Sequence, residues 1–429
     1  MAIPFVDLKA QYAGLKEDID ARIQRVFDHG SYIMGPEVAE LEKTLGAYVG
    51  AKHAMSCSSG TDALLLALMA AGVGPGDAVF TTPFTFIATA EVISLLDATP
   101  VFVDIDPLTY NIDATELDKA IRALKAADRT IYPLPLTPDA SSLTAKAVIA
   151  VDLYGLPADY DALQAVCTEH GLFLLEDAAQ SFGAEYKGKK ACAFGDAAAT
   201  SFFPAKPLGC YGDGGMVFTD RDDLAEIMRS LRVHGKGTDK YDNVRVGLNA
   251  RMDTLQAAIV LAKFEVFPEE VEKRQEVARR YTELLKGRDW LFVTRDSLES
   301  RGLSPTTNHE SRITNHGISE SPVTNHAPLV TPHVPEGSKS AWAQYTLRLP
   351  NGDRKAVQEA AQKAGVPTMV YYPKPLHLQT AFAGLGYVPG AFPESEKASE
   401  EVLSLPFGPY LDVGDQKKVA VALHRAEPI

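Results

Sequence analysis

The sequence predicts an α/β fold in which a large, mainly parallel sheet is followed by a small α+β unit. Short apolar runs of strand length alternate with helical patterns along the first part of the chain, as in parallel sheets covered by helices on both faces. From residue 341 the order becomes strand, helix, strand and helices. A chain of 429 residues is long enough for both units. We therefore expect a large domain over residues 1–287 and a small one over 288–429.

Composition narrows the function classes. Acidic residues outnumber basic ones 56 to 42, without a long basic run, which disfavours nucleic-acid binding and leaves room for a local basic pocket. The N-terminus lacks signal-peptide features, and no apolar run approaches membrane-spanning length. The four cysteines are far apart, with no C-x-x-C pair. We therefore expect a cytoplasmic protein with reduced thiols, without a disulfide framework or a cysteine metal site.

Two amphipathic helices are predicted at the N-terminus. Residues 4–30 place apolar side chains on one side of a helix. Pro36 is well placed as the first residue of a second helix, because its missing N–H is not needed there. Further strands are expected near residues 78–81, 101–104, 147–151 and 215–219, and residues 126–144 as a surface excursion.

An anion-binding turn is predicted where the first strand leads into a helix, at S-C-S-S-G-T-D-A-L. Gly60 lets a backbone amide approach an anion closely, and Thr61 adds a hydroxyl at the helix start. An ordinary capped helix has the same local pattern. Both interpretations stay open from these residues alone.

Lys206 lies in a stiff loop just after an expected strand at residues 197–200. The loop reads S-F-F-P-A-K-P-L-G-C-Y-G-D-G-G, and its prolines and glycines exclude regular structure. A lysine that is partly desolvated and fixed in direction suits a Schiff base with a carbonyl. The alternative is a solvated surface lysine, which is common in loops.

Asp177 follows an unbroken apolar run at residues 172–175, which predicts a strand buried on both faces. Open α/β sheets bind ligands at this carboxyl end. A carboxylate there needs a cationic partner, such as the protonated ring nitrogen of pyridoxal phosphate. Gln180 lies three residues further on and could bond the phenolic oxygen of the same ring. Alternatively, Asp177 caps a helix that opens at residues 178–179.

These two segments give the chain a family resemblance. E-D-A-A-Q-S-F-G followed by the lysine loop resembles the DegT/DnrJ/EryC1/StrS family of sugar-nucleotide aminotransferases. The likeness runs from residue 4 to about 287 and resumes at about 345. It implies a PLP-dependent aminotransferase type I fold, with a mostly parallel seven-stranded sheet and a small C-terminal α+β domain. It also implies pyridoxal 5'-phosphate as the cofactor and Lys206 as the catalytic residue.

The resemblance assigns further roles. The implied cofactor-binding residues are Gly60, Thr61, Phe86, Asp177, Gln180, Ser201, Lys206 and Asn249. The implied substrate-binding residues are Gly30, Tyr32, Arg251, Tyr371 and Tyr372. In the family, Asn249 matches a residue that reaches the partner subunit's cofactor phosphate, which implies a homodimer with composite active sites. Arg251 would suit a hexuronate carboxylate.

Ordinary structural roles are the alternatives for several of these residues. Phe86 could be a core residue, and Tyr32 a packing aromatic. Asn249 could cap the long helix that follows it, with Arg251 as a surface residue. Relatives usually carry a histidine at the position of Tyr371, so the match for carboxylate recognition is incomplete there.

Residues 297–331 depart from the family pattern. T-N-H occurs three times there, amid serine, proline and threonine, so a metal site has to be weighed. The spacings of seven and ten are irregular, and no cysteine or acid set accompanies the histidines. We therefore expect a loosely packed, low-complexity insertion in the small domain, and no metal.

The implied reaction is transamination of a nucleotide-linked keto sugar. The resemblance favours UDP-2-acetamido-2-deoxy-3-oxo-hexuronate as the acceptor and L-glutamate as the donor, for surface polysaccharide or O-antigen synthesis. One alternative is a dTDP-linked 3- or 4-keto sugar. Another is a non-catalytic binding or regulatory protein, but Lys206, Asp177 and Gln180 are all present, which argues against it.

Overall fold

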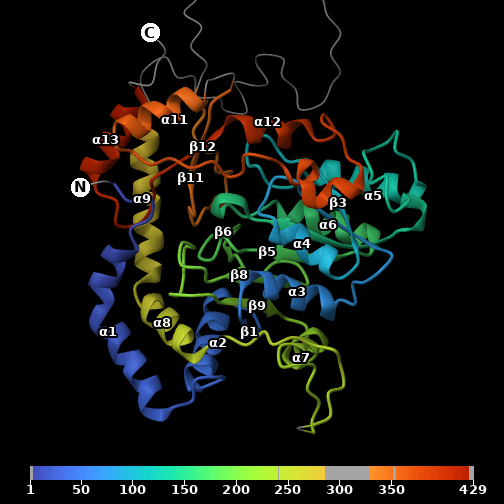
Figure 1. The fold of residues 1–429 in the computed structure, drawn as a ribbon, viewed down its shortest axis with the longest axis horizontal. Helices are drawn as coiled ribbons and strands as arrows, with labels where there is room; N and C mark the ends of the chain where they lie inside the picture. The colour runs from blue at the N-terminus through green and yellow to red at the C-terminus, as the bar shows by residue number, and fades with distance from the viewer. Residues whose placement is uncertain (1–2, 240, 286–328, 351–353, 425–429) are drawn as a thin grey trace, which may run out of the picture.

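A seven-stranded sheet forms the centre of the molecule (Figure 1). The computed structural model describes residues 3–239, 241–285, 329–350 and 354–424. The sheet order is β1-β9-β8-β5-β4-β2-β3. Its strands are β1 (His53–Cys57), β2 (Asp77–Thr81), β3 (Thr99–Phe102), β4 (Thr144–Val151), β5 (Phe173–Asp177), β8 (Ala197–Ser201) and β9 (Gly215–Thr219). Only β9 runs antiparallel to its neighbours, so the predicted mostly parallel sheet is confirmed.

Helices cover both faces of the sheet. The helices concerned are α2 (Pro36–Val49), α3 (Gly60–Ala70), α4 (Ala88–Leu95), α5 (Ala114–Ala126), α6 (Tyr160–His170), α7 (Asp222–Leu231) and α8 (Thr254–Phe264). Helices α3, α4 and α7 share one face, whereas α5 and α6 cover the other face at the β3 end and α2 and α8 at the β1 end. Side chains along β5 point alternately to the two faces of the sheet, so Leu174 packs in the core on one face and Leu175 in the core on the other. The layers form the predicted α/β architecture.

Helix α9 (Phe267–Leu285) contributes to two cores. Its first half, with Phe267 and Val271, packs in the core of α2 and α8. Its second half, from Val277 to Leu285, belongs to a separate core, and Figure 1 shows α9 running between the two regions. The proposed domain boundary near residue 287 therefore follows a helix that both regions share. Helix α1 (Leu8–His29) packs against α8 through Ile19 and Ile259.

The second core contains a two-stranded antiparallel sheet and two helices. These elements are β11 (Tyr345–Arg348), β12 (Val402–Leu405), α11 (Arg354–Lys363) and α13 (Val413–His424). The remaining elements are α12 (Pro393–Glu401), a small sheet of β6 (Glu185–Tyr186), β7 (Lys189–Lys190) and β10 (Ser338–Lys339), and the 3-10 turns η1 (Ala140–Ser142), η2 (Leu153–Gly155), η3 (Leu376–Leu378) and η4 (Thr380–Leu385). Leu376, Phe382 and Phe392 pack in the core beside α5 and α6, so part of the C-terminal region packs on the large sheet.

Two irregular segments were singled out in the sequence. Residues 126–144 are anchored to the body, because Tyr132 and Leu134 are buried in the core beside α5. Most of the T-N-H segment lies outside the described residues. At its described end, Leu329 is buried in the second core and Val330 pairs with Arg348.

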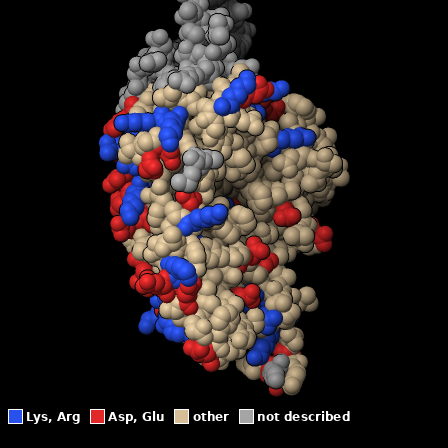
Figure 2. Space-filling model, turned by 60° about the vertical axis from the view of Figure 1, so that its left-hand side comes forward, with Lys and Arg blue, Asp and Glu red and all other residues tan. Residues whose placement is uncertain are grey.

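The surface mixes charges of both signs. Figure 2 shows acidic and basic side chains interspersed on the face in view, and the whole sequence carries a net charge of −14. Among the helices that the structure describes, none has the length and apolar character needed to cross a membrane. All four cysteines are buried and unpaired, as their spacing predicts.

Candidate active site

The candidate site lies where neighbouring parallel strands end. Asp177 is the last residue of β5 and pairs in register with Val151 of β4 and Ala199 of β8. Asp152 follows β4, and Ser201 ends β8. Parallel strands bring their carboxyl ends to one edge of the sheet, which is the usual position of ligands in such folds.

Asp177 is held by two donors at the end of its strand. One carboxylate oxygen accepts a hydrogen bond of 2.8 Å from the Thr89 hydroxyl, and the other accepts one of 3.2 Å from the Ala179 N–H. Burial raises the pKa of Asp177, although the Thr89 hydrogen bond, the Ala179 N–H and the charge of Lys206 oppose this. The helix-cap interpretation is wrong, because residues 179–183 form turns and no helix follows Asp177 there. This buried acid is suited to a cationic partner.

Lys206 lies in a loop that folds back on itself. Its N–H donates to the Phe203 carbonyl at 2.8 Å, and the Cys210 N–H donates to the Phe202 carbonyl at 2.7 Å. Burial lowers the pKa of the Lys206 amine, and the negative charge of Asp177 partly offsets this. A lowered pKa increases the fraction of unprotonated, nucleophilic amine. A fully solvated lysine does not fit these surroundings.

Gln180 connects the sheet edge to the C-terminal region. Its Oε1 accepts a 2.8 Å hydrogen bond from the Tyr154 N–H, and its Nε2 donates to the Tyr372 hydroxyl at 3.4 Å. The ring of Phe86 is 6.3 Å from that of Tyr372 and is 55% exposed, so the core interpretation of Phe86 is wrong. Tyr371 contacts Phe5 edge-on at 6.3 Å. Side chains from distant parts of the sequence therefore meet around Gln180 and Tyr372.

The predicted anion turn begins α3. Ser59 caps this helix, since its hydroxyl accepts from the Asp62 N–H at 3.0 Å and its carbonyl from the Ala63 N–H at 3.0 Å. The N–H groups of Gly60 and Thr61 have no acceptor within the helix. A Cβ on Gly60 would lie 2.7 Å from that of Ser201. Glycine therefore lets the turn approach the strand that leads to Lys206.

The remaining predicted residues form a second group. The Thr254 N–H donates to the Tyr32 carbonyl at 2.9 Å, and Gly30 precedes Tyr32 at the left-handed end of α1. Arg251 Nε donates to Asn249 Oδ1 at 2.9 Å. Helix α8 begins only at Thr254, so Asn249 does not cap it. Tyr32 is 49% exposed and contacts Phe27 edge-on at 6.5 Å.

This second group passes close to the anion turn of its own chain. Ala250, between Asn249 and Arg251, accepts a 3.2 Å hydrogen bond from the Ser58 N–H. Ser58 is two residues before Gly60. The group therefore lies beside the anion turn of its own chain.

Two buried carboxyl groups behind Asp177 were missed in the sequence. Asp152 accepts hydrogen bonds from the Tyr160 and Ser181 hydroxyls at 2.7 and 2.6 Å. Glu176 accepts from the N–H groups of Cys192 and Phe194 at 2.7 and 2.9 Å. Burial raises the pKa of Asp152 to about 7. It also raises the pKa of Glu176 well above its usual value, and the nearby charge of Asp152 adds to this rise. Both shifts favour the protonated form, so the pair is suited to share a proton.

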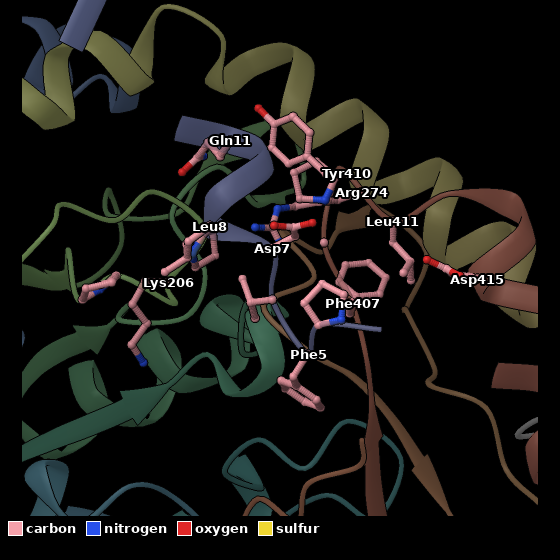
Figure 3. A pocket seen from close by; sticks show the side chains of 16 residues that line it. Phe5, Asp7, Leu8, Gln11, Lys206, Arg274, Phe407, Tyr410, Leu411 and Asp415 are labelled. Carbon is pink, nitrogen blue, oxygen red and sulfur yellow. The ribbon is translucent and has the colours of Figure 1, made fainter. Parts of the chain in front are cut away.

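A cavity of about 50 Å³ borders the lysine loop and is lined in part by Pro204, Lys206 and Pro207. Figure 3 shows the Lys206 side chain extending away from Arg274, which lines this cavity with Gln11 and Tyr410. Arg274 is 5% exposed, and its Nε is without a hydrogen-bond partner in the described chain. The cavity has room for a few water molecules, which would satisfy such groups.

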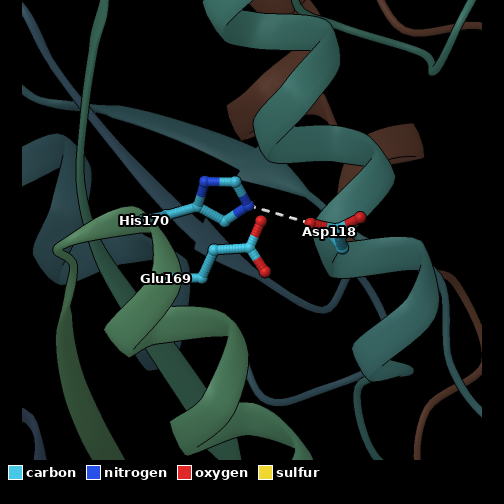
Figure 4. Close-up of side chains that lie close together, drawn as sticks. All are labelled: Asp118, Glu169 and His170. Atoms are coloured by element: carbon cyan, nitrogen blue, oxygen red, sulfur yellow. Dashed lines mark hydrogen bonds and ion pairs between the residues drawn. The ribbon is translucent and has the colours of Figure 1, made fainter.

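Asp118, Glu169 and His170 form a cluster of metal-ligand type within the described chain (Figure 4). His170 bonds Asp118 at 2.8 Å. Arg122 already donates to Asp118 and Glu169 at 2.7 and 2.8 Å. The cluster is therefore a surface ion-pair network, and we assign no metal to it.

This sheet-edge site on a mostly parallel α/β fold is of the aminotransferase class, and comparison with known proteins agrees. The profile of the DegT/DnrJ/EryC1/StrS aminotransferase family matches residues 14–316 and 307–424. The chain belongs to this family. It is accordingly an aminotransferase of nucleotide sugars, and its cofactor is pyridoxal 5'-phosphate.

Individual relatives are similar over most of their length. The chain is 45% identical to the UDP-2-acetamido-2-deoxy-3-oxo-D-glucuronate aminotransferase of Pseudomonas aeruginosa, over 98% of this chain and 99% of that one. A DegT DnrJ EryC1 StrS aminotransferase from Brucella abortus is 42% identical, with a TM-score of 0.83 and 99% of both chains covered. The NtdA protein of Bacillus subtilis, solved with bound cofactor PMP, is 26% identical, with a TM-score of 0.76 over 96% of this chain and 82% of that one.

Proposed function

We propose that this enzyme moves an amino group from L-glutamate to the C3 keto group of UDP-2-acetamido-2-deoxy-3-oxo-hexuronate. The observation that carries the substrate is the 45% identity with the Pseudomonas aeruginosa enzyme over nearly both whole chains. The product would be a UDP-linked 3-amino sugar for surface polysaccharide, such as lipopolysaccharide O-antigen.

The described residues fit pyridoxal 5'-phosphate. When bound, the cofactor supplies a carbonyl for amine exchange and a ring that accepts electrons. Buried Asp177, whose pKa is raised by its burial, would meet the ring nitrogen and keep it protonated. Gln180 Nε2 would donate to the phenolic oxygen, and Phe86 would cover a ring face.

The phosphate would bind at the start of α3. The amide groups of Gly60 and Thr61 point out of the helix N-terminus, where backbone N–H groups and the helix dipole favour anions. Ser201 lies against Gly60, so its hydroxyl is placed for the same phosphate. Three donors from two neighbouring elements would thus hold one anion.

Lys206 would do the proton chemistry. Its amine would hold the cofactor in the resting enzyme and, once released, would take and return a proton at the carbon that carries the transferred amine. The lowered pKa of this amine favours both tasks near neutral pH. The charge of Asp177 and the hydrogen bonds of the loop would hold the Lys206 amine in position for this proton transfer.

We further propose a homodimer in which Asn249 and Arg251 reach the partner's site. Exposed apolar side chains near this group support a covering second copy: Phe27, Tyr32, Ile33, Met34, Val244 and Val246. Arg251 would bind the hexuronate carboxylate, and Gly30, Tyr32, Tyr371 and Tyr372 would border the sugar nucleotide. The unpaired cysteines support a reducing, cytoplasmic location.

Product analysis tests the substrate. The purified holoenzyme is incubated with L-glutamate and a panel of UDP- and dTDP-linked keto sugars, with and without a hexuronate carboxylate. Mass spectrometry should find the 3-amino product of the UDP-linked 3-keto hexuronate at the highest rate. Faster amination of a dTDP-linked 3- or 4-keto sugar would overturn this proposal and support the alternative substrate class.

A further inference from the structure

A buried lysine lies behind the Lys206 loop. Lys263, near the end of α8, is 1% exposed. Its Nζ donates a 2.6 Å hydrogen bond to the carbonyl of Gly209 and lies 4.3 Å from the centroid of the Tyr211 ring. Gly209 and Tyr211 follow Lys206 by three and five residues. Lysine is rarely buried to this degree unless a partner holds its charge, so the contact with the loop has to be explained.

The charge of Lys263 is poorly compensated. Burial lowers the pKa of its amine to about 8, and the negative charge of Glu270 opposes this. Glu270 itself is engaged by Gln11 Nε2 at 3.0 Å and by the Tyr410 hydroxyl at 2.6 Å. An uncompensated buried cation destabilises a fold. Groups of this kind occur disproportionately at functional sites, and the hydrogen-bond acceptor here belongs to the lysine loop.

Backbone bonds and side chains of α8 hold opposite sides of this loop. A Cβ on Gly209 would lie 2.6 Å from the Phe203 carbonyl oxygen, so the chain doubles back tightly. On the α8 side, Lys263 holds the Gly209 carbonyl and Gln256 Oε1 accepts the Tyr211 N–H at 2.9 Å. The loop is therefore clamped between its own strand and α8.

We propose that Lys263 is a positioning residue for catalysis, holding the turn at Gly209 from behind and thereby fixing the direction of the Lys206 side chain. Pro207 lies between the two, and its ring fixes its own φ angle. Leu208 is 2% exposed and packed in the core. A displacement of Gly209 therefore also displaces Lys206, because Pro207 and Leu208 have little freedom to adjust. This inference rests on the proposed role of Lys206.

Lys263→Met tests this role, because methionine keeps the length and apolar packing of the side chain and removes its hydrogen-bond donor. The variant should fold and bind pyridoxal 5'-phosphate. Its kcat should fall by about tenfold or more, as expected for a displaced catalytic group, whereas KM for the nucleotide sugar should stay within about twofold. The absorbance of the bound cofactor, titrated with pH, should show a shifted midpoint.

Two comparisons separate positioning from general destabilisation. Lys273→Met on α9 removes a lysine whose side chain is 44% exposed and pairs with Glu269 at 2.9 Å, and it should match the unchanged enzyme in every measurement. Lys263→Gln keeps a neutral donor and should fall between the unchanged enzyme and Lys263→Met. The rate at which cofactor-free protein takes up pyridoxal 5'-phosphate gives a readout independent of turnover, and it should slow in the same order.

An unchanged kcat and absorbance midpoint in a folded Lys263→Met would overturn the proposal. So would failure of both Lys263 variants to fold with cofactor present, because Lys263 would then be a folding residue. Borohydride reduction of the unchanged enzyme and peptide mapping keep the two hypotheses apart. Cofactor trapped on another lysine refutes the role of Lys206, whereas cofactor on Lys206 with an unaffected Lys263→Met refutes only the positioning role.

Discussion

Thr89 donates a 2.8 Å hydrogen bond to Asp177, and both side chains are buried. Together with the Ala179 N–H at 3.2 Å, this bond fixes the plane of the carboxylate. Preorganised groups of this kind stabilise charge without reorganising during the reaction. The fold itself therefore holds the Asp177 carboxylate in position.

Asp177→Asn should lower turnover by about a hundredfold or more, because the amide keeps the shape but removes the charge that would hold the ring nitrogen protonated. Steady-state rates are measured at equal cofactor content. Asp222→Asn, at a side chain that is 70% exposed and pairs with Lys52 and His53, provides a control that should retain full rate. A small effect at Asp177 would mean that its carboxylate serves only the local turn.

Lys206→Ala should give a folded protein in which borohydride no longer fixes the cofactor to the chain. In the unchanged enzyme, peptide mapping after reduction should recover the cofactor on Lys206, because this buried amine has a lowered pKa. Circular dichroism checks that the variant is folded. Recovery of a reduced adduct on a different lysine of Lys206→Ala would refute the assignment.

Mixing two inactive variants tests the composite site. Lys206→Ala and Arg251→Ala should each be nearly inactive, yet co-refolding should restore about a quarter of the unchanged activity. With random pairing, about half of the dimers are hybrids, and each hybrid has one site with both residues intact if Arg251 acts across a two-fold interface. Activity is assayed after the hybrids have been confirmed with differently tagged chains.

The hydrogen bond from Ser58 to Ala250 makes this a sharp test, since it places Arg251 near its own chain's anion turn. If Arg251 served its own site, no hybrid site would contain both residues. Confirmed hybrids without activity would therefore place Arg251 in the site of its own chain, or outside the site altogether.

Asp152→Asn should make the protein more stable relative to the unchanged chain as pH rises. Burial raises the pKa of Asp152 from 3.8 to about 7, so the folded state keeps a proton that the unfolded chain releases. This contribution to stability is fully present below the unfolded pKa and is lost as pH rises through the folded one. Asparagine cannot ionise, and its amide can donate to Ser181 or Glu176.

Melting temperatures of the cofactor-free proteins at about pH 5 and about pH 8 check this. The difference between variant and unchanged protein should grow by about 3 °C or more in favour of the variant. Asp18→Asn, at an exposed position of α1, is the matched control and should show a flat difference. An equally flat difference for Asp152→Asn would contradict the shared-proton interpretation.

Local sequence patterns were sufficient for most of the sheet, because buried parallel strands read as short apolar runs. The bounds of the third strand differ from the prediction, because the sequence predicts residues 101–104 and the strand forms at Thr99–Phe102. Pro100 argues against a strand unless that strand lies at an edge. Strand β3 is indeed an edge strand, but the order of strands cannot be read from one segment.

Long-range packing explains what was missed in the site. The patterns at Asp177 and Asn249 both suggested helix caps, because local sequence resembles a cap wherever an acid or amide precedes helix formers. The pairing of Asp152 with Glu176 depends on the register of β4 and β5. Lys263 carried a usable signal, since it ends the apolar run of residues 257–262 on a buried helix.

The contact of Gly60 with Ser201 has a counterpart, since a Cβ on Gly215 would lie 2.4 Å from the backbone of Ser59. The turn that starts α3 thus packs directly against both β8 and β9, and the glycines place no side chain between them. The distance between the proposed phosphate site at the start of α3 and the strand that leads to Lys206 is consequently fixed. A cofactor analogue with one carbon more or fewer between ring and phosphate would place its carbonyl at the wrong distance from Lys206. The backbone contacts leave this distance no room to adjust.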